Sequence, residues 1–194
     1  MHVQSDEVLL RRAQKGDADA FEELMAGQES RMYAIALRMM GNREDAQDCA
    51  QEAMVRIYRA MSAFKGQSSL ATWIYRITMN TCLDELRRRK VRKVSSLDSM
   101  LEAGWSPVDT GDTPEEHGLR SEKQEALNAA LQSLPDDMRA AIILRDVKGY
   151  SYDEIADILD ANVGTIKSRI SRGREKLREI LVKQSELFGR QSVK

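Results

Sequence analysis

Apolar residues recur every three or four positions through the first part of the chain, which is the spacing of one face of an α-helix. The recurring positions are Val8, Leu9, Phe21, Leu24, Met25, Met32, Ile35, Ala36 and Met39. Two interruptions, at Gly16 and at Gly41-Asn42, carry residues that commonly end helices. This pattern predicts helices separated by short turns from Asp6 to about Arg92.

A long helix is predicted over residues 43–63. Its expected buried face comprises Ala50, Met54, Ile57, Tyr58 and Met61, and its polar face comprises Asp45, Asp48, Gln51, Glu52, Arg56 and Arg59. Small and polar residues over 64–69 indicate a loop, and Ser69 is placed to cap a helix that begins near Ala71. That helix ends in four consecutive cations, at residues 87–90.

Residues 93–120 show no apolar period. They contain Pro107, Pro114, three glycines and an excess of acidic side chains. Such a composition is typical of a linker. We therefore predict two helical domains, over residues 1–92 and 121–194, joined by a flexible acidic linker over residues 93–120.

The second domain carries the pattern of a helix-turn-helix. After predicted helices over 122–134 and 136–147, the sequence from Ser151 to Glu154 fits a capping box that opens a short helix. A turn at 160–162 follows, and Asn162 is placed to cap a helix from Val163 to about Leu181. Two helices joined by so short a turn form the helix-turn-helix motif. The predicted fold class is all-α.

The last helix divides into a buried stripe and a polar face. Steps of 100° per residue from Ile166 place Ile170, Gly173 and Leu177 on the stripe. The rest of the first half carries Thr165, Lys167, Ser168, Arg169, Ser171, Arg172 and Arg174. Short hydroxyls with an arginine suit base edges, and flanking cations suit phosphates. An ordinary surface helix is the alternative, but the preceding capped helix and the surplus of cations favour contact with DNA.

Charge is segregated along the chain, although 30 basic and 31 acidic side chains give a net charge of only -1. Residues 65–93 carry 8 basic and 2 acidic side chains, and residues 165–194 carry 9 and 3, so each segment has a net charge of +6. Two separated basic patches suit a protein that grips a polyanion at two places. Solvated helix ends would give the same pattern, so charge alone does not distinguish them from a polyanion-binding surface.

Composition argues against several other classes of protein. No apolar run approaches the roughly 18 residues of a membrane span, and the polar start argues against secretion, so we expect a cytoplasmic chain without membrane insertion. Two cysteines, Cys49 and Cys82, and two histidines form no recognisable ligand spacing. We therefore expect neither a metal nor a cofactor.

An enzyme is the first alternative function. Neighbouring carboxylates such as Asp136-Asp137 point about 100° apart on a helix and do not converge on one substrate atom. Neither His2 nor His117 lies on a predicted helix, and no phosphate-binding loop or HExxH motif occurs. We predict that the chain alone is not an enzyme.

The first basic patch shares its helix with Trp73, Tyr75 and Asn80 and adjoins the loop over 64–69. Aromatic rings and open backbone groups suit single-stranded or flipped bases. The alternative is that Phe64 and Trp73 are core residues. We hold that alternative open for Trp73 and expect the ring of Phe64, which lies in the loop, to be exposed.

Two sets of motifs resemble a known family, the bacterial extracytoplasmic-function sigma factors. The segments Glu44–Met54, Arg56–Arg59, Phe64–Gly66 and Thr72–Ile77, together with Asn80, resemble region two of that family. The segments Leu134-Pro135, Ile155-Ala156 and Val163–Arg174 are similar to its region four. The resemblance spans about Asp6 to Leu181, in the family's order, and leaves the linker unmatched.

The resemblance implies a role for each surface. It implies that the clamp helices of the largest subunit of core RNA polymerase bind Asp45, Asp48, Gln51 and Glu52. It implies that the −10 promoter element contacts Phe64, Lys65, Gly66, Gln67, Ser68, Ser69, Arg76, Asn80, Arg87 and Arg88, with a flipped non-template base held by the loop above Asn80. It implies that the −35 element is read by Thr165, Lys167, Ser168, Arg169, Ser171, Arg172 and Arg174.

The same resemblance implies further partners. The first two helices of the second domain would grip the flap of the second-largest subunit, and the acidic linker would run toward the RNA exit path. A cognate anti-sigma factor, often membrane-bound, is also implied. A dimeric helix-turn-helix repressor or activator is the second alternative, but it leaves Asn80, the loop and the acidic helix face without a function.

Overall fold

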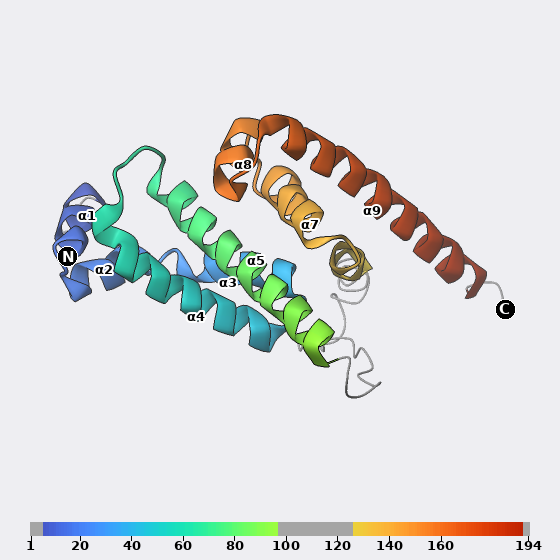
Figure 1. Cartoon of the computed structure of the whole chain (residues 1–194), viewed down its shortest axis with the longest axis horizontal. Helices are drawn as coiled ribbons and strands as arrows, with labels where there is room; N and C mark the ends of the chain where they lie inside the picture. The colour runs from blue at the N-terminus through green and yellow to red at the C-terminus, as the bar shows by residue number, and fades with distance from the viewer. Residues whose placement is uncertain (1–5, 97–125, 192–194) are drawn as a thin grey trace.

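The structure, a computed structural model, describes residues 6–96 and 126–191, and every element in these ranges is helical (Figure 1). The first half contains α1 (Asp6–Gln14), α2 (Ala18–Met25), α3 (Glu29–Met40), α4 (Arg43–Ala60), the 3₁₀ turn η1 (Met61–Ala63) and α5 (Leu70–Ser96). The second half contains helical residues 126–132, α7 (Asp136–Ile142), the π-helical segment η2 (Ile143–Val147), α8 (Tyr152–Leu159) and α9 (Val163–Gln191). The predicted all-α class is confirmed.

Short polar side chains set where α4 and α5 begin. The side-chain oxygen of Asn42 accepts from the backbone N–H of Asp45 at 2.9 Å, and Ser69 Oγ accepts from the N–H of Thr72 at 3.1 Å. Gly41 ends α3 in the left-handed conformation, with φ of 82°. The predicted cap at Ser69 is confirmed, and with it the position of the loop before α5.

The first half has its own apolar core, to which all of its helices from α1 to α5 contribute. Its largest fully buried side chains include Met25, Met32, Ile57, Met61 and Ile74. Trp73 and Phe64 belong to the same cluster, with ring centroids 5.1 Å apart. The expectation that the Phe64 ring is exposed is therefore wrong, because this ring covers Trp73 at the edge of the core and only 9% of the residue is exposed.

The second half forms the predicted helix-turn-helix. Ser151 and Glu154 make a complete capping box at the start of α8, and Asp160 ends α8 in the left-handed conformation, with φ of 47°. Asn162 Oδ1 accepts from the backbone N–H of Thr165 at 2.8 Å and so caps α9. An added Cβ at Gly173 would lie 3.0 Å from Ile142, so the glycine lets α9 pack closely on α7.

A larger apolar cluster joins the two halves. It combines Met39, Tyr75 and Met79 of the first half with Leu131 and Ile158 of the second, among other buried residues. Figure 1 shows α5 lying between the helices of its own half and the α7–α8 pair. The two halves therefore pack against each other over a shared core.

Three sequence predictions need correction. Tyr58 is 47% exposed, because the buried stripe of α4 runs through Ala46, Cys49, Ala53 and Ile57 and is rotated away from Tyr58. The helix predicted over 136–147 changes to π-helical geometry at Ile143. The last helix continues to Gln191 rather than ending near Leu181, since no proline interrupts that segment.

The predicted linker over 93–120 lies outside the described residues, except for its first four positions, which form the end of α5. The boundaries of the two predicted domains stay predictions. Within the described ranges, no helix has the length and apolar character needed to cross a membrane.

Candidate nucleic-acid interface

The exposed face of α9 presents the residues predicted to read DNA. Lys167, Ser171 and Arg172 are exposed, whereas Ile166 and Ile170 on the opposite face are buried. Arg172 makes no hydrogen bond or ion pair to another residue that the structure describes. Its guanidinium therefore remains available for a bidentate contact, the arrangement that arginine makes with guanine or phosphate.

The first turn of α9 uses its hydroxyls internally. The Thr165 hydroxyl donates to Asn162 Oδ1 at 2.8 Å, and the Ser168 hydroxyl donates to the carbonyl of Thr165 at 2.8 Å. Both residues are half-buried. Of the short hydroxyls predicted to contact bases, Ser171 is the one that the structure leaves exposed and without such a bond.

Two arginines of the predicted −35 set already have acidic partners. Arg169 donates from Nη2 to Asp137 Oδ2 at 2.8 Å, and Arg174 donates from Nε to Asp146 Oδ2 at 3.0 Å. The hydrogen bonds from Arg174 to Asp146 raise the pKa of this guanidinium. Both arginines lie at the surface, with 25% and 51% of their side chains exposed, so a phosphate competes with these carboxylates for them.

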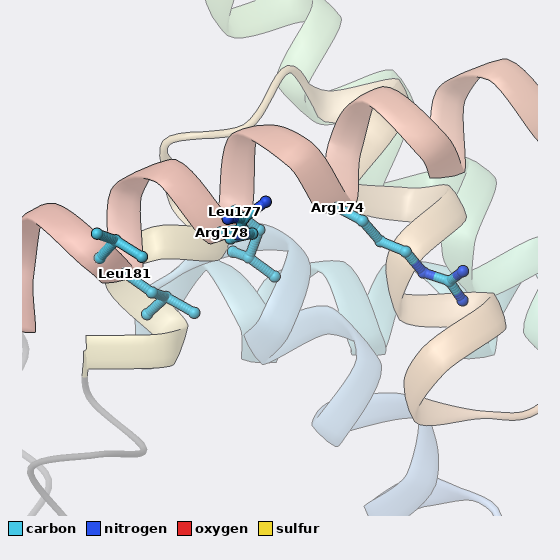
Figure 2. Close-up of a pocket in the computed structure, with 5 residues that line it drawn as sticks. Arg174, Leu177, Arg178 and Leu181 are labelled. Carbon is cyan, nitrogen blue, oxygen red and sulfur yellow. The ribbon is translucent and has the colours of Figure 1, made fainter.

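The apolar stripe of α9 continues past the helix-turn-helix as a shallow surface groove (Figure 2). Its lining residues are Arg174, Leu177, Arg178, Leu181 and Val182. Figure 2 shows these side chains along one stretch of the helix. The groove places apolar side chains beside two cations, Arg174 and Arg178, on the surface of α9.

The loop before α5 is exposed from Lys65 to Ser69. Gly66 has φ of 69°, and an added Cβ would meet no atom within 4 Å, so the backbone here faces open space. The amide of Gln14 on α1 donates to the carbonyl of Phe64 at 2.9 Å and fixes the base of the loop. Together with the buried Phe64 ring, this bond holds an open loop on a rigid support.

The predicted −10 residues on α5 occupy three different environments. Arg76 is exposed and makes no described hydrogen bond or ion pair. Arg87 pairs with Asp84 at 3.4 Å, and both groups are largely exposed, so this pair contributes little stability. Asn80 is half-buried, and its Nδ2 donates at 3.3 Å to the carbonyl of Ile158 on α8.

Arg88, the remaining predicted −10 residue, lies 3.7 Å from Glu85 with 55% of its side chain exposed. It therefore stays accessible to a phosphate, as Arg87 does.

The polar face of α4 contains both paired and unpaired groups. Arg89 donates two hydrogen bonds to Asp45, which lower the pKa of that carboxyl group. Glu52 pairs with Arg56 at 2.9 Å. Asp48 and Gln51 are exposed and have no hydrogen bond or ion pair to another described residue. They are therefore the members of the predicted set that are free to contact a partner.

Sequence analysis missed apolar side chains beside this face. Val55 and Tyr58 are 41% and 47% exposed, one and two helical turns beyond Gln51. The spacing of three and four residues from Asp48 through Gln51 and Val55 to Tyr58 could have identified them. Apolar groups next to unpaired polar groups are typical of a protein interface.

The two cysteines lie between α4 and α5 and are buried. The hydrogen bond to Cys49 and burial raise the pKa of the Cys82 thiol. Among the described residues, histidine, cysteine, aspartate and glutamate side chains form no group of three or more that could hold a metal ion.

Two family models match the chain. The model of sigma-70 region 2 matches residues 27–92, and the model of sigma-70 region 4 matches residues 124–177. The RNA polymerase sigma-H factor of Pseudomonas aeruginosa is 35% identical over 182 residues, which cover 92% of this chain and 94% of that one. The ECF RNA polymerase sigma-E factor of Escherichia coli K12 is 38% identical over 175 residues, which cover 88% and 91%.

Solved structures resemble the fold described above. The sigma factor RpoE from Bartonella quintana, solved in complex with the anti-sigma factor NepR, matches with a TM-score of 0.65 and 27% identity over 83% of this chain and 96% of that chain. CnrH, solved in complex with the cytosolic domain of CnrY, matches with a TM-score of 0.63 and 24% identity over 93% and 99%.

Proposed function

Because the chain belongs to the sigma-70 family, as a sigma factor of the extracytoplasmic-function group, we propose that it binds core RNA polymerase, recognises the −35 and −10 elements of promoters and promotes strand opening by capturing a flipped non-template base. The observation that carries this proposal is the match of both family regions, in order, to the two helical halves that bear the surfaces described above.

The −35 element is read by α9. The exposed Arg172 and Ser171 contact base edges in the major groove, and Lys167 contacts a phosphate. Arg169 and Arg174 contact phosphates in competition with Asp137 and Asp146. This division assigns sequence readout to the side chains without a described partner.

The −10 element binds at the loop over 64–69 and at Asn80. The open backbone around Gly66 accepts a base that has left the duplex, and the Asn80 amide hydrogen-bonds an edge that pairing no longer hides. Arg76, Arg87 and Arg88 hold the backbone of the separated strand. Binding of the flipped base offsets the unstacking cost of a few kcal/mol.

Core polymerase binds the polar face of α4 through Asp48 and Gln51, with Val55 and Tyr58 adding apolar contact. Asp45 and Glu52 support this face through their arginine partners. An anti-sigma factor is a further proposed partner, since RpoE from Bartonella quintana was solved in complex with one.

Run-off transcription tests the proposal. We expect the purified chain to direct core polymerase to specific start sites, and Asn80→Ala to reduce the permanganate reactivity of promoter thymines more than it reduces duplex binding. A dimeric repressor would instead bind palindromic duplex without directing initiation. Equal initiation by core polymerase with and without the chain would contradict the proposal.

A further inference from the structure

The loop before α5 is fixed at both ends and open between them. At the downstream end, Ser69 caps α5, and its carbonyl accepts from the N–H of Trp73 at 3.0 Å. Lys65, Gly66 and Gln67 are exposed and make no hydrogen bond or ion pair to another residue that the structure describes. The conformation of the loop therefore depends on how its two ends are held.

At the upstream end, the last fixed backbone group is the carbonyl of Phe64. Local bonds stop at the Phe64 N–H, which donates to the carbonyl of Met61 at 3.2 Å. The backbone then becomes extended, with φ of −67° and ψ of 116° at Phe64. The Phe64 carbonyl accepts from Nε2 of Gln14, which lies 50 residues earlier in the chain, at 2.9 Å. A side chain of α1 therefore sets the direction in which the backbone enters the open loop.

α1 presents Gln14 from a rigid position. Leu9 and Ala13, on the face of α1 that packs into the core, are 4% and 5% exposed. The helix ends at Gln14, and Arg12 pairs with Asp17 at 2.8 Å across the turn that follows. Gln14 itself is half-buried, so water competes only in part for its amide.

A groove of about 370 Å³ lies between α1 and the loop. Its lining includes Leu10 and Gln14 of α1 as well as Phe64 and Gly66 at the start of the loop. Because this groove is large enough to take a side chain, a loop without the Gln14 bond has room to collapse toward α1. The bond therefore selects the open conformation from others that the same space allows.

Gln14 lies outside the part of the chain that matches region 2. The model of sigma-70 region 2 matches residues 27–92, and α1 ends before that range begins. A residue outside the matched range therefore fixes a loop inside it.

We propose that Gln14 is a positioning residue for base capture: its amide holds the Phe64 carbonyl so that the loop accepts the unpaired base of the −10 strand. This inference rests on the proposed function and adds α1 to the −10 site. Gln14 acts through the loop backbone and not on the base. It raises the fraction of molecules whose loop is competent, and apparent affinity scales with that fraction.

Substitutions at Gln14 separate the hydrogen bond from the packing of the side chain. Gln14→Met keeps a similar length and removes the donor, whereas Gln14→Lys keeps a donor on a side chain long enough to reach the Phe64 carbonyl. Leu9→Val is the control for stability, since it trims a buried side chain of the same helix that takes no part in the bond.

The assay uses core polymerase that carries the full chain. The probe is a promoter fragment found by the run-off assay, double-stranded through the −35 element and with an unpaired non-template −10 strand. An abasic nucleotide is placed at each position of that strand in turn. The captured base is the one whose removal weakens binding of the wild-type chain but not of Asn80→Ala. The discrimination factor is the affinity for the intact strand divided by the affinity for the strand that is abasic at this position.

We expect Gln14→Met to lower the discrimination factor about 2- to 10-fold, which is the range for one net hydrogen bond, and Gln14→Lys to restore it. Because the factor compares two strands of equal charge, the cation that Gln14→Lys adds cancels from it. Leu9→Val should lower the free energy of unfolding and leave the factor unchanged.

Three results would overturn the inference while base capture stands. They are a wild-type factor in Gln14→Met, a factor that Gln14→Lys does not restore, and a factor that Leu9→Val lowers as much as Gln14→Met does. A strand without any Asn80-dependent position would contradict base capture itself, and the inference with it. The abasic scan therefore distinguishes failure of the proposed function from failure of the role of Gln14.

Discussion

Arg139 and Arg172 have the same guanidinium group, but Arg139 is buried and Arg172 is exposed. Arg139 is almost fully buried, and burial lowers its pKa, yet its nitrogens reach five acceptors, four of them backbone carbonyls. Removing this guanidinium would leave those buried carbonyls without a hydrogen-bond donor. Arg172 is exposed with no described partner, so its removal leaves the fold unchanged and tests function alone.

We expect Arg172→Ala to cost about 1–3 kcal/mol in recognition of the −35 element, the range for one arginine that reads a base. The measurement is run-off transcription from promoters with single substitutions in that element. Arg178→Ala is the matched control, since it removes an exposed cation six residues closer to the C-terminus, outside the predicted reading set. An unchanged ranking of promoters would remove Arg172 from the base-reading residues.

A second prediction at the residue scale concerns acid stability. Because hydrogen bonds from Arg89 lower the folded-state pKa of Asp45, its stabilisation is complete above the unfolded pKa of about 3.9 and is lost as pH falls through the lower folded value. Asp45→Asn should therefore lower the free energy of unfolding by about 1 kcal/mol at pH 7. Urea unfolding across pH should show this difference shrinking below pH 4, and a constant difference would contradict the assignment.

At the scale of helices, the sequence predicted the features that depend on residues close together in the chain. The caps at Ser69, Ser151 and Asn162 follow from hydrogen bonds between neighbours three residues apart, and the sequence analysis found all of them. The buried stripe of α9 also followed from spacing, because Ile166 and Ile170 pack within one domain. The rotation of the α4 stripe, which exposes Tyr58, and the burial of Phe64 against Trp73 depended on the neighbouring helices.

Contacts between the halves had no comparable signal. Nothing near Arg139 or Tyr150 in the sequence indicates that one satisfies carbonyls of α3 or that the other lies on Tyr75. Arginine side chains are rarely buried, so Arg139 would be expected to face solvent. The structure confirms the helices predicted to carry Asn80 and the −35 residues. Whether Asn80 faces solvent or α8 depends on packing between segments almost 80 residues apart.

The exposed face of α4 supports a prediction about the polymerase. Asp48→Ala combined with Gln51→Ala should weaken association with core polymerase about 10- to 100-fold, since truncation of hot-spot residues typically costs 2 kcal/mol or more. Both side chains are exposed, so the free energy of unfolding should change by less than about 0.5 kcal/mol. Fluorescence titration of labelled chain with core enzyme measures the affinity.

The control for this double variant is Glu23→Ala on α2, which removes one exposed negative charge away from α4. It should bind core polymerase as the wild-type chain does. Undiminished binding of the α4 double variant would show that the polymerase contacts another surface.

At the scale of the whole molecule, the shared apolar core is what holds the two halves together. The larger apolar cluster contains residues from both halves, so separation exposes Tyr75 and Met79 on one side and Ile158 on the other. Separating the halves would therefore cost the free energy of transferring these apolar side chains to water.

Cutting the connection between the halves allows the strength of their association to be measured directly. A protease site inserted within residues 97–120 allows the folded chain to be cleaved into two pieces, whose association then depends on concentration. A tether gives the halves an effective concentration in the millimolar range. A dissociation constant of about 10 μM for the cleaved pieces thus corresponds to about 99% closure in the intact chain. We expect the pieces to co-elute at about 100 μM. Tyr150→Ala should separate them, because the Tyr150 ring contacts Tyr75 of the first half, whereas Tyr152→Ala should not, because the described ring contacts of Tyr152 lie within the second half. Pieces that separate at that concentration without any substitution would show that the shared core does not hold the halves together in the intact chain.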